Sequence, residues 1–83
     1  MLDSLSWEVM NATADDWESL HQIMSRVCEF CGQVEPAAMA ELIATLVDNG
    51  LMEEMQGRIV QSTDVLADPI DFWFRMTPMG RAV

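Results

Sequence analysis

Residues 42–52 read LIATLVDNGLM, and within them a helical spacing of apolar residues gives way to a different period. Up to Gly50 the apolar residues recur at intervals of three and four, which is typical of the buried stripe of a helix. They are Met39, Leu42, Ile43, Leu46 and Val47. Pro36 suits the first position of such a helix, and Gly50 suits its end because glycine adopts a left-handed backbone easily. We therefore expect a helix over residues 36–49 and a strand over residues 51–55.

A short helix is expected near the start of the chain, over residues 4–14. Ser4 or Ser6 can serve as its N-cap, since a serine hydroxyl accepts a hydrogen bond from a free backbone N–H group of the first turn. The residues that fall on one side at helical spacing are Leu5, Val9, and Met10 or Ala12.

A longer helix is expected over residues 16–31. Asp15 and Glu18 have the spacing of a capping box, and Gly32 is placed to end the helix. Its apolar residues again step by three and four: Trp17, Leu20, Ile23, Met24, Val27, Phe30 and Cys31.

The last third of the chain has the pattern of strands and turns. Residues 56–57 (Gln-Gly) can form a turn, after which residues 58–61 can pair back on the first strand. Residues 62–69 are predicted to be a loop, and residues 70–76 a strand that Thr77-Pro78 ends. One face of that strand would hold Ile70, Phe72, Phe74 and Met76. The other face would hold Asp71, Trp73 and Arg75.

Three helices followed by a two- or three-stranded hairpin is the order of a winged-helix domain. Residues 42–52 resemble the end of the third helix of that family and the strand that follows it. Residues 74–81, FRMTPMGR, resemble the final wing strand running into a Leu-Thr-Pro-Lys-Gly-Arg-like ending. The chain thus resembles the winged-helix (winged helix-turn-helix) family, in its small bacterial type. The resemblance implies one α+β domain over residues 1–83, with three helices packed on a small antiparallel hairpin or sheet. It also implies DNA binding through the third helix and the wing.

The charge of the chain conflicts with DNA binding. The 83 residues include 14 acids and four bases, all arginine, for a net charge of −10. Residues 1–57 hold eleven of the acids and one base, Arg26, whereas residues 58–83 have a net charge of zero. A negative surface repels nucleic acid and anionic lipid at long range. The acids indicate either a solvated face that aids solubility or a surface for a basic partner.

The outward face of the third helix lacks the side chains that read DNA bases. That face is expected to hold Ala37, Ala40, Glu41, Ala44, Thr45 and Asp48. Apart from the terminal Asn49, it offers no arginine, lysine, glutamine or asparagine to a base edge. We therefore expect a non-enzymatic protein-interaction or regulatory module, able to self-associate. The alternative is a DNA-binding regulator that uses the third helix together with wing arginines, namely Arg58, Arg75 and Arg81.

Five residues are the predicted partner contacts: Trp73, Arg75, Arg58, Glu41 and Asp48. Trp73 is chosen because Phe72 and Phe74 should face the helices, which turns the indole outward. A large aromatic ring contributes much contact area at low entropy cost. The alternative is that Trp73 lies under residues 62–69.

No catalytic or metal site is expected. Cys28 and Cys31 form a C-x-x-C at a helix C-terminus, where the dipole does not favour a thiolate, so they are expected to be packed or half-buried. His21 is predicted to occupy a surface position, and it has no second cysteine pair with which to bind zinc. Neighbouring strand residues Glu53 and Glu54 point to opposite faces and cannot converge on a metal.

The three aspartates in the last third of the chain do not predict a calcium site either. The spacing of Asp64, Asp68 and Asp71 does not match an EF-hand loop. We therefore expect no cofactor. The sequence shows no signal peptide, and no apolar run long enough to span a membrane, so a cytoplasmic location is the expectation.

Overall fold

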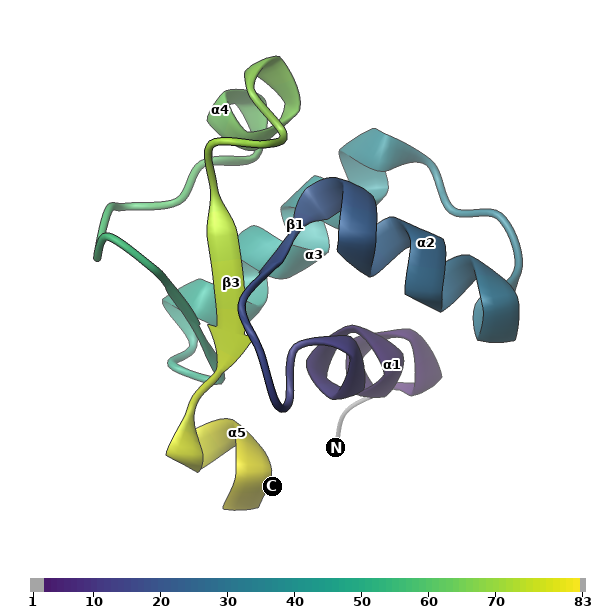
Figure 1. Cartoon of the computed structure of the whole chain (residues 1–83), viewed down its shortest axis with the longest axis horizontal. Coiled ribbons are helices and arrows are strands. Elements are labelled where there is room, and N and C mark those ends of the chain that lie inside the picture. The colour runs from purple at the N-terminus through teal and green to yellow at the C-terminus, as the bar shows by residue number, and fades with distance from the viewer. Residues whose placement is uncertain (1–2, 83) are drawn as a thin grey trace.

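The computed structural model describes residues 3–82, apart from the side chains of Phe30 and Cys31 (Figure 1). The elements are, in order, α1 (Ser4–Ala12), β1 (Glu18–Ser19), α2 (Leu20–Cys31), α3 (Pro36–Asp48), β2 (Met52–Glu54), α4 (Ser62–Ala67), β3 (Trp73–Met76) and α5 (Pro78–Ala82). The three strands form one antiparallel sheet in the order β1-β3-β2. The predicted α+β class is therefore confirmed.

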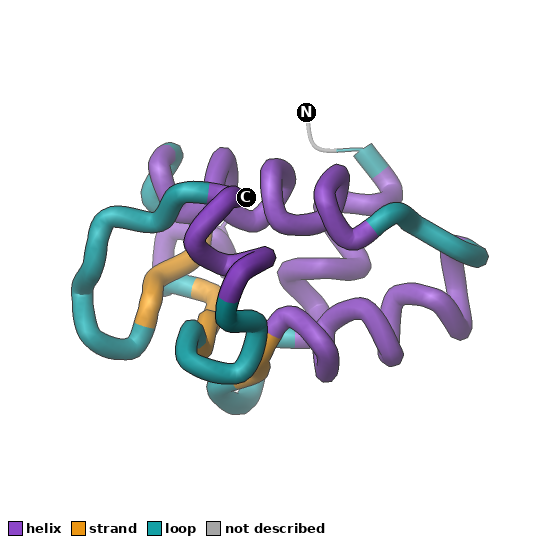
Figure 2. Tube along the Cα trace, turned by 90° about the horizontal axis from the view of Figure 1, so that it is seen from above, coloured by secondary structure: helices purple, strands orange, loops and turns teal. Residues whose placement is uncertain are grey.

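The first three helices pack against one another as a small bundle, and the short sheet lies beside it (Figures 1 and 2). One hydrophobic core joins the two parts. It contains Val9 and Met10 of α1, Ile23 and Val27 of α2, Ile43 and Leu46 of α3, and Phe74 at the centre of the sheet. Along β3 the core-facing residues alternate with the others, since Phe74 and Met76 are buried while Trp73 and Arg75 are half-buried. The predicted alternation of this strand is confirmed from Phe72 onward.

The helix α3 begins and ends close to the predicted positions. Pro36 occupies its first turn, and Gly50 follows its end with a φ of 78°. One residue of its predicted outward face is misplaced, because Ala40 is fully buried. Ala40 directly follows the buried Met39, and the apolar stripe of α3 is one residue wider than the pattern of large side chains suggested.

Both N-terminal caps differ from the predicted ones. Asp3, not Ser4 or Ser6, caps α1: its Oδ1 accepts a hydrogen bond from the Ser6 N–H at 2.8 Å. That bond holds the pKa of Asp3 below its usual value, because it stabilises the carboxylate. The second helix starts at Leu20 rather than residue 16, with Ser19 and Gln22 forming the capping box.

The late start of α2 has a physical reason in the sheet. Glu18 and Ser19 are extended and pair with Phe74 and Trp73, so the chain forms β1 before it turns into the helix. Trp17 consequently precedes the helix and is not part of its apolar face.

The connection between β2 and β3, residues 55–72, differs most from the prediction. Residues 58–61 form no strand, because β2 pairs with β3 instead. Residues 62–67 form α4 where a loop was predicted, and its Val65 is fully buried in the core. Ile70 does not share the core face of Phe72; it lies before the start of β3 and is 67% exposed.

Residues 77–81, TPMGR, follow β3 and make contacts that hold them against the rest of the domain. The Thr77 hydroxyl donates to the Gly50 carbonyl at 2.6 Å and accepts from the Gly80 N–H at 3.1 Å. Pro78 starts the short helix α5, which the sequence did not predict. Gly80 is buried against the Leu51 carbonyl, and Arg81 donates to the Ala14 carbonyl.

Candidate partner-binding surface

The β2–β3 connection displays most of the large apolar side chains that are exposed within residues 3–82. They are Met55, Ile59, Leu66 and Ile70; among the side chains that the structure describes, Trp7 and Met79 are the others. Ile59 is the extreme case, with 87% of its surface exposed. Single exposed apolar residues are ordinary, but four on one segment make this segment the candidate interaction surface.

The Arg58 side chain makes contacts with residues at both ends of this connection. Its guanidinium bonds Glu54 twice, from Nε to Oε1 at 3.2 Å and from Nη2 to Oε2 at 3.0 Å. Its Nη1 reaches Asp71 Oδ2 at 2.7 Å, and its Nη2 also donates to the Asp71 carbonyl. The guanidinium carbon lies 4.0 Å from the centre of the Phe72 ring, a cation–π contact. The predicted contact Arg58 therefore ties the two ends of the connection together.

Glu54 is the buried partner in this cluster, with only 1% of its side chain exposed. Burial by itself would raise the pKa of Glu54, but the hydrogen bonds from the Arg58 side chain and backbone N–H outweigh it. The pKa of Glu54 is therefore lowered. The hydrogen bonds that Arg58 donates to Glu54 and Asp71 raise the pKa of Arg58, so its guanidinium group stays protonated.

The other two arginines of the last third are also engaged in contacts within the domain. Arg75 lies opposite Glu53 in the sheet, with Nη2 3.3 Å from Oε1, and stacks 4.4 Å from the centre of the Trp17 ring. Arg81 contacts the Ala14 carbonyl and lies 4.0 Å from the Asp15 carboxylate. Each of the three predicted wing cations is therefore already beside an acid.

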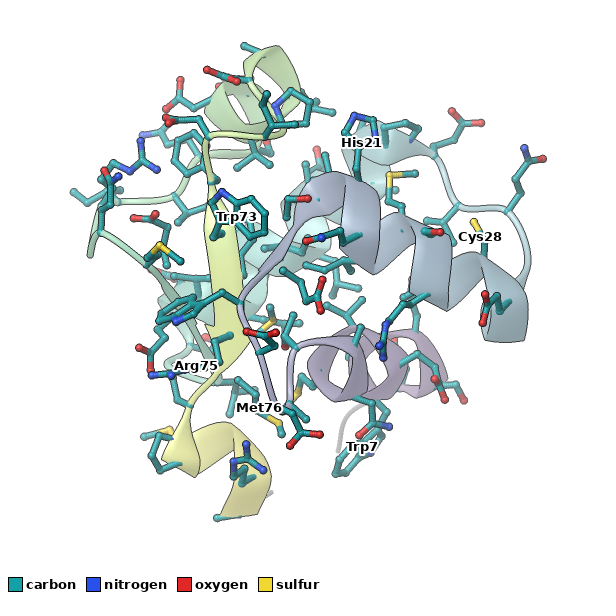
Figure 3. All side chains as sticks on the ribbon, viewed as in Figure 1. Trp7, His21, Cys28, Trp73, Arg75 and Met76 are labelled. Carbon is teal, nitrogen blue, oxygen red and sulfur yellow. The ribbon has the colours of Figure 1, made fainter. Side chains whose placement is uncertain are left out.

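Trp73 lies on the sheet face away from the core, beside Arg75 along β3 (Figure 3). Its side chain is half-buried, and its indole N–H donates to the Ile70 carbonyl at 3.0 Å. The predicted outward direction is confirmed, and the bond anchors the indole to the end of the β2–β3 connection. Its role in binding stays a prediction.

Glu41 and Asp48 are exposed on α3, as predicted. Asp48 is the last residue of the helix, where the negative end of the helix dipole disfavours a carboxylate. We expect Asp48→Asn to raise the free energy of unfolding by about 0.3–1 kcal/mol, because it removes this repulsion. Urea titration measures the change, and Glu41→Asn, in mid-helix, is the control. A destabilised Asp48→Asn protein would contradict this account.

A groove lies between α3 and the β2–β3 connection, with a volume of about 210 Å³. The α3 side supplies Ala44, Val47 and Asp48, and the connection supplies Arg58, Ile59 and Val60. Ile59 and Val60 were predicted to lie in a strand, so their place in the lining of a groove was not predicted.

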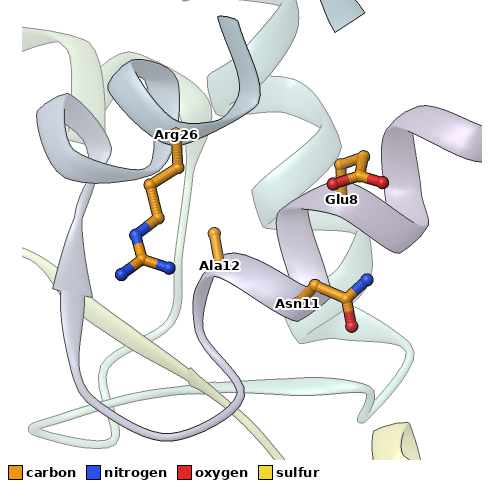
Figure 4. A pocket seen from close by; sticks show the side chains of 4 residues that line it. All are labelled: Glu8, Asn11, Ala12 and Arg26. Carbon is orange, nitrogen blue, oxygen red and sulfur yellow. The ribbon is translucent and has the colours of Figure 1, made fainter. Parts of the chain in front are cut away.

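A second pocket, of about 260 Å³, lies between α1 and α2 and is lined by Glu8, Asn11, Ala12 and Arg26 (Figure 4). Arg26 extends from α2 toward α1. The pocket brings together none of the predicted contacts.

Among the described side chains, those considered as metal ligands or nucleophiles form no common site. His21 is exposed in the first turn of α2, as predicted, and Cys28 lies farther along the same helix (Figure 3). Cys28 is exposed rather than packed, because it follows the buried Val27 and is turned away from the core. The side chain of Cys31 lies outside the described residues. Within the described side chains, no group of three or more His, Cys, Asp or Glu could hold a metal ion.

Among residues 3–82, no helix has the length and apolar character needed to cross a bilayer. Family models, curated proteins and solved structures were compared with the chain, and none of them matches it.

Proposed function

We propose that this chain is a winged-helix-type domain that acts as a non-enzymatic protein-interaction module. The helices α1, α2 and α3 precede β2, a long connection and β3, as in the family resemblance, with β1 added between α1 and α2 and α4 added within the connection. A four-residue link, residues 32–35, joins α2 to α3 and begins with Gly32 at a φ of 79°. Short links that contain glycine are typical of helix-turn-helix pairs. In this proposal the β2–β3 connection is the wing.

The observation that carries the proposal is the chemistry of the β2–β3 connection. Its cation, Arg58, is bound to Glu54 and Asp71, while its apolar residues Ile59 and Ile70 are exposed. A DNA-binding wing requires the reverse, because phosphate contacts come from free arginine and lysine side chains. Exposed aliphatic residues beside a folded helix favour a protein partner.

The neighbouring face of α3 supports the same function. Glu41 and Asp48 are exposed there, and their carboxylates would repel the phosphates of a DNA backbone bound to this face. A DNA-binding regulator would also need Arg75 and Arg81, which lie beside Glu53 and Asp15.

We expect the purified domain not to bind mixed-sequence duplex DNA. Even non-specific DNA-binding proteins have dissociation constants of about 10⁻⁴–10⁻⁶ M at physiological salt, and they bind more tightly as salt is lowered. Fluorescence anisotropy at low salt should therefore show no binding up to about 100 μM protein. Binding that weakens steeply as salt is added would overturn the proposal in favour of the DNA-binding regulator.

The protein-binding side of the proposal is tested with two variants of equal chemistry. Ile70→Asp changes the β2–β3 connection, and Met79→Asp changes an exposed apolar residue of α5. Captured partners from cells of the source organism should be lost with Ile70→Asp and retained with Met79→Asp. Light scattering over a range of concentrations shows whether the partner is a second copy of the chain. Equal capture by both variants would contradict the proposed surface.

A further inference from the structure

We infer that the groove between α3 and residues 58–60 binds a peptide segment that carries one apolar side chain flanked by arginine or lysine. This inference rests on the proposed function and names the chemistry of the partner. It depends on the aliphatic side chains that line part of the groove, the exposure of Ile59 and the charge of the rim.

The lining of the groove is suited to an apolar anchor. Ala44 and Val47 form the α3 side, and Ile59 and Val60 form the opposite side. Val60 packs partly against the core, whereas Ile59 stands 87% exposed on the rim. An inserted apolar side chain would cover Ile59, which the domain alone leaves in water.

The size of the groove indicates what it can hold. Its volume of about 210 Å³ is below the range of about 300–1,000 Å³ typical of pockets that enclose small-molecule ligands. It is therefore suited to one anchoring side chain of a longer segment. The rest of the segment would extend along α3, as in helix-in-groove and extended-peptide recognition.

The charge of the rim indicates the flanking residues. The Arg58 guanidinium is neutralised by Glu54 and Asp71, so it does not repel a cation. Asp48 lines the groove, and Glu41 is exposed two turns earlier on α3. The chain as a whole carries a net charge of −10, which steers a basic partner toward it and repels a second copy of itself. Charge complementarity therefore favours a basic segment of another protein.

The probe for this inference is a phage-displayed library of short random peptides, selected on the immobilised full chain. We expect the enriched sequences to combine leucine, isoleucine or phenylalanine with arginine or lysine. Each enriched peptide is then made with a fluorophore, and its affinity is measured by anisotropy. Selection without enrichment, or enrichment of sequences that lack basic residues, would overturn the inference.

Two variants locate the peptide on the groove. Ile59→Asp should weaken binding about tenfold or more, the loss typical of an interface hot spot, while Met79→Asp should leave it unchanged. Both residues are exposed, so near-identical thermal unfolding of the two variants verifies that the fold is intact. Equal binding by wild type and Ile59→Asp would overturn the groove as the site.

A charge exchange tests the role of Asp48. Asp48→Lys should weaken binding of the basic peptide, and a peptide with glutamate in place of its arginines should bind this variant better than the wild type. No change in preference would overturn the predicted flanking charge. Failure of these peptide experiments without any DNA binding removes only the groove inference. DNA binding in the anisotropy assay removes the proposed function itself.

Discussion

Replacing Gly80 with alanine is expected to lower the free energy of unfolding by about 3 kcal/mol, the upper part of the range for overpacked sites. A β-carbon at this position would lie 2.3 Å from the Leu51 carbonyl oxygen and 2.8 Å from the Met76 side chain. The carbonyl is backbone and cannot move aside without shifting the entry into β2. For a domain of this size, a loss of about 3 kcal/mol corresponds to a fall of roughly 12–24 °C in Tm. Differential scanning calorimetry measures it.

Gly57→Ala is the matched control for Gly80→Ala. Gly57 has a positive φ of 73° but open space around the position of a β-carbon. Alanine there should cost only about 1 kcal/mol of backbone strain. Equal losses for the two variants would show that glycine is required at Gly80 for its flexibility and not for the close approach of α5 to Leu51.

Replacing Glu54 with glutamine is expected to lower the free energy of unfolding by about 1–3 kcal/mol, the cost of weakening buried hydrogen bonds to a charged group. The amide keeps the shape of the carboxylate, but it offers Arg58 one neutral oxygen in place of two charged ones. The neighbouring Glu53 pairs with Arg75 in a half-exposed position. Glu53→Gln should therefore cost no more than about 1 kcal/mol, as exposed pairs do. Equal losses in urea titrations of the two variants would contradict the predicted role of burial.

The stability difference between the wild type and Glu54→Gln should also depend on pH, with a definite sign. The pKa of Glu54 is lower in the folded state than its usual value of 4.5, so the folded state is stabilised when this carboxyl is charged. This contribution is complete above the unfolded-state pKa and is lost as the pH falls through the lower, folded pKa. The difference in stability between wild type and Glu54→Gln should therefore shrink below about pH 4.5. A difference that stays constant from neutral to acid pH would contradict it.

The sequence predicted those parts of the fold that depend on local periodicity. In α3, the spacing of Leu42, Ile43 and Leu46, with Pro36 before and Gly50 after, determines both ends of the helix. The alternation of Phe72, Phe74 and Met76 likewise predicted the core face of β3. Each of these signals lies within a few residues of the element that it describes.

The parts that were missed depend on contacts between distant residues. The two-residue strand β1 exists because Glu18 and Ser19 pair with β3, and no local pattern predicts this. Its consequence, the start of α2 at Leu20, was readable from the Ser19/Gln22 capping box. Six-residue helices such as α4 are too short to be stable alone or to show a period, so α4 depends on packing against α3 and the core.

The candidate surface was predictable only in part. The exposure of Glu41 and Asp48 followed from the helical face of α3. The Glu54/Arg58/Asp71 cluster did not follow, because Asp71 is thirteen residues from Arg58 and meets it only when the β2–β3 connection folds back. The exposure of Ile59 depends on that same reversal of the chain.

The burial of Val65 gives the β2–β3 connection an anchor in the middle as well as at its two ends. A long surface loop held only at its ends would lose conformational entropy when a partner ordered it. Here folding has already met that cost, since α4 packs its valine into the core and Arg58 joins the two ends. Preorganisation of this kind leaves more of the contact energy available for affinity. A partner should therefore be able to bind by rigid docking, with little rearrangement of this domain.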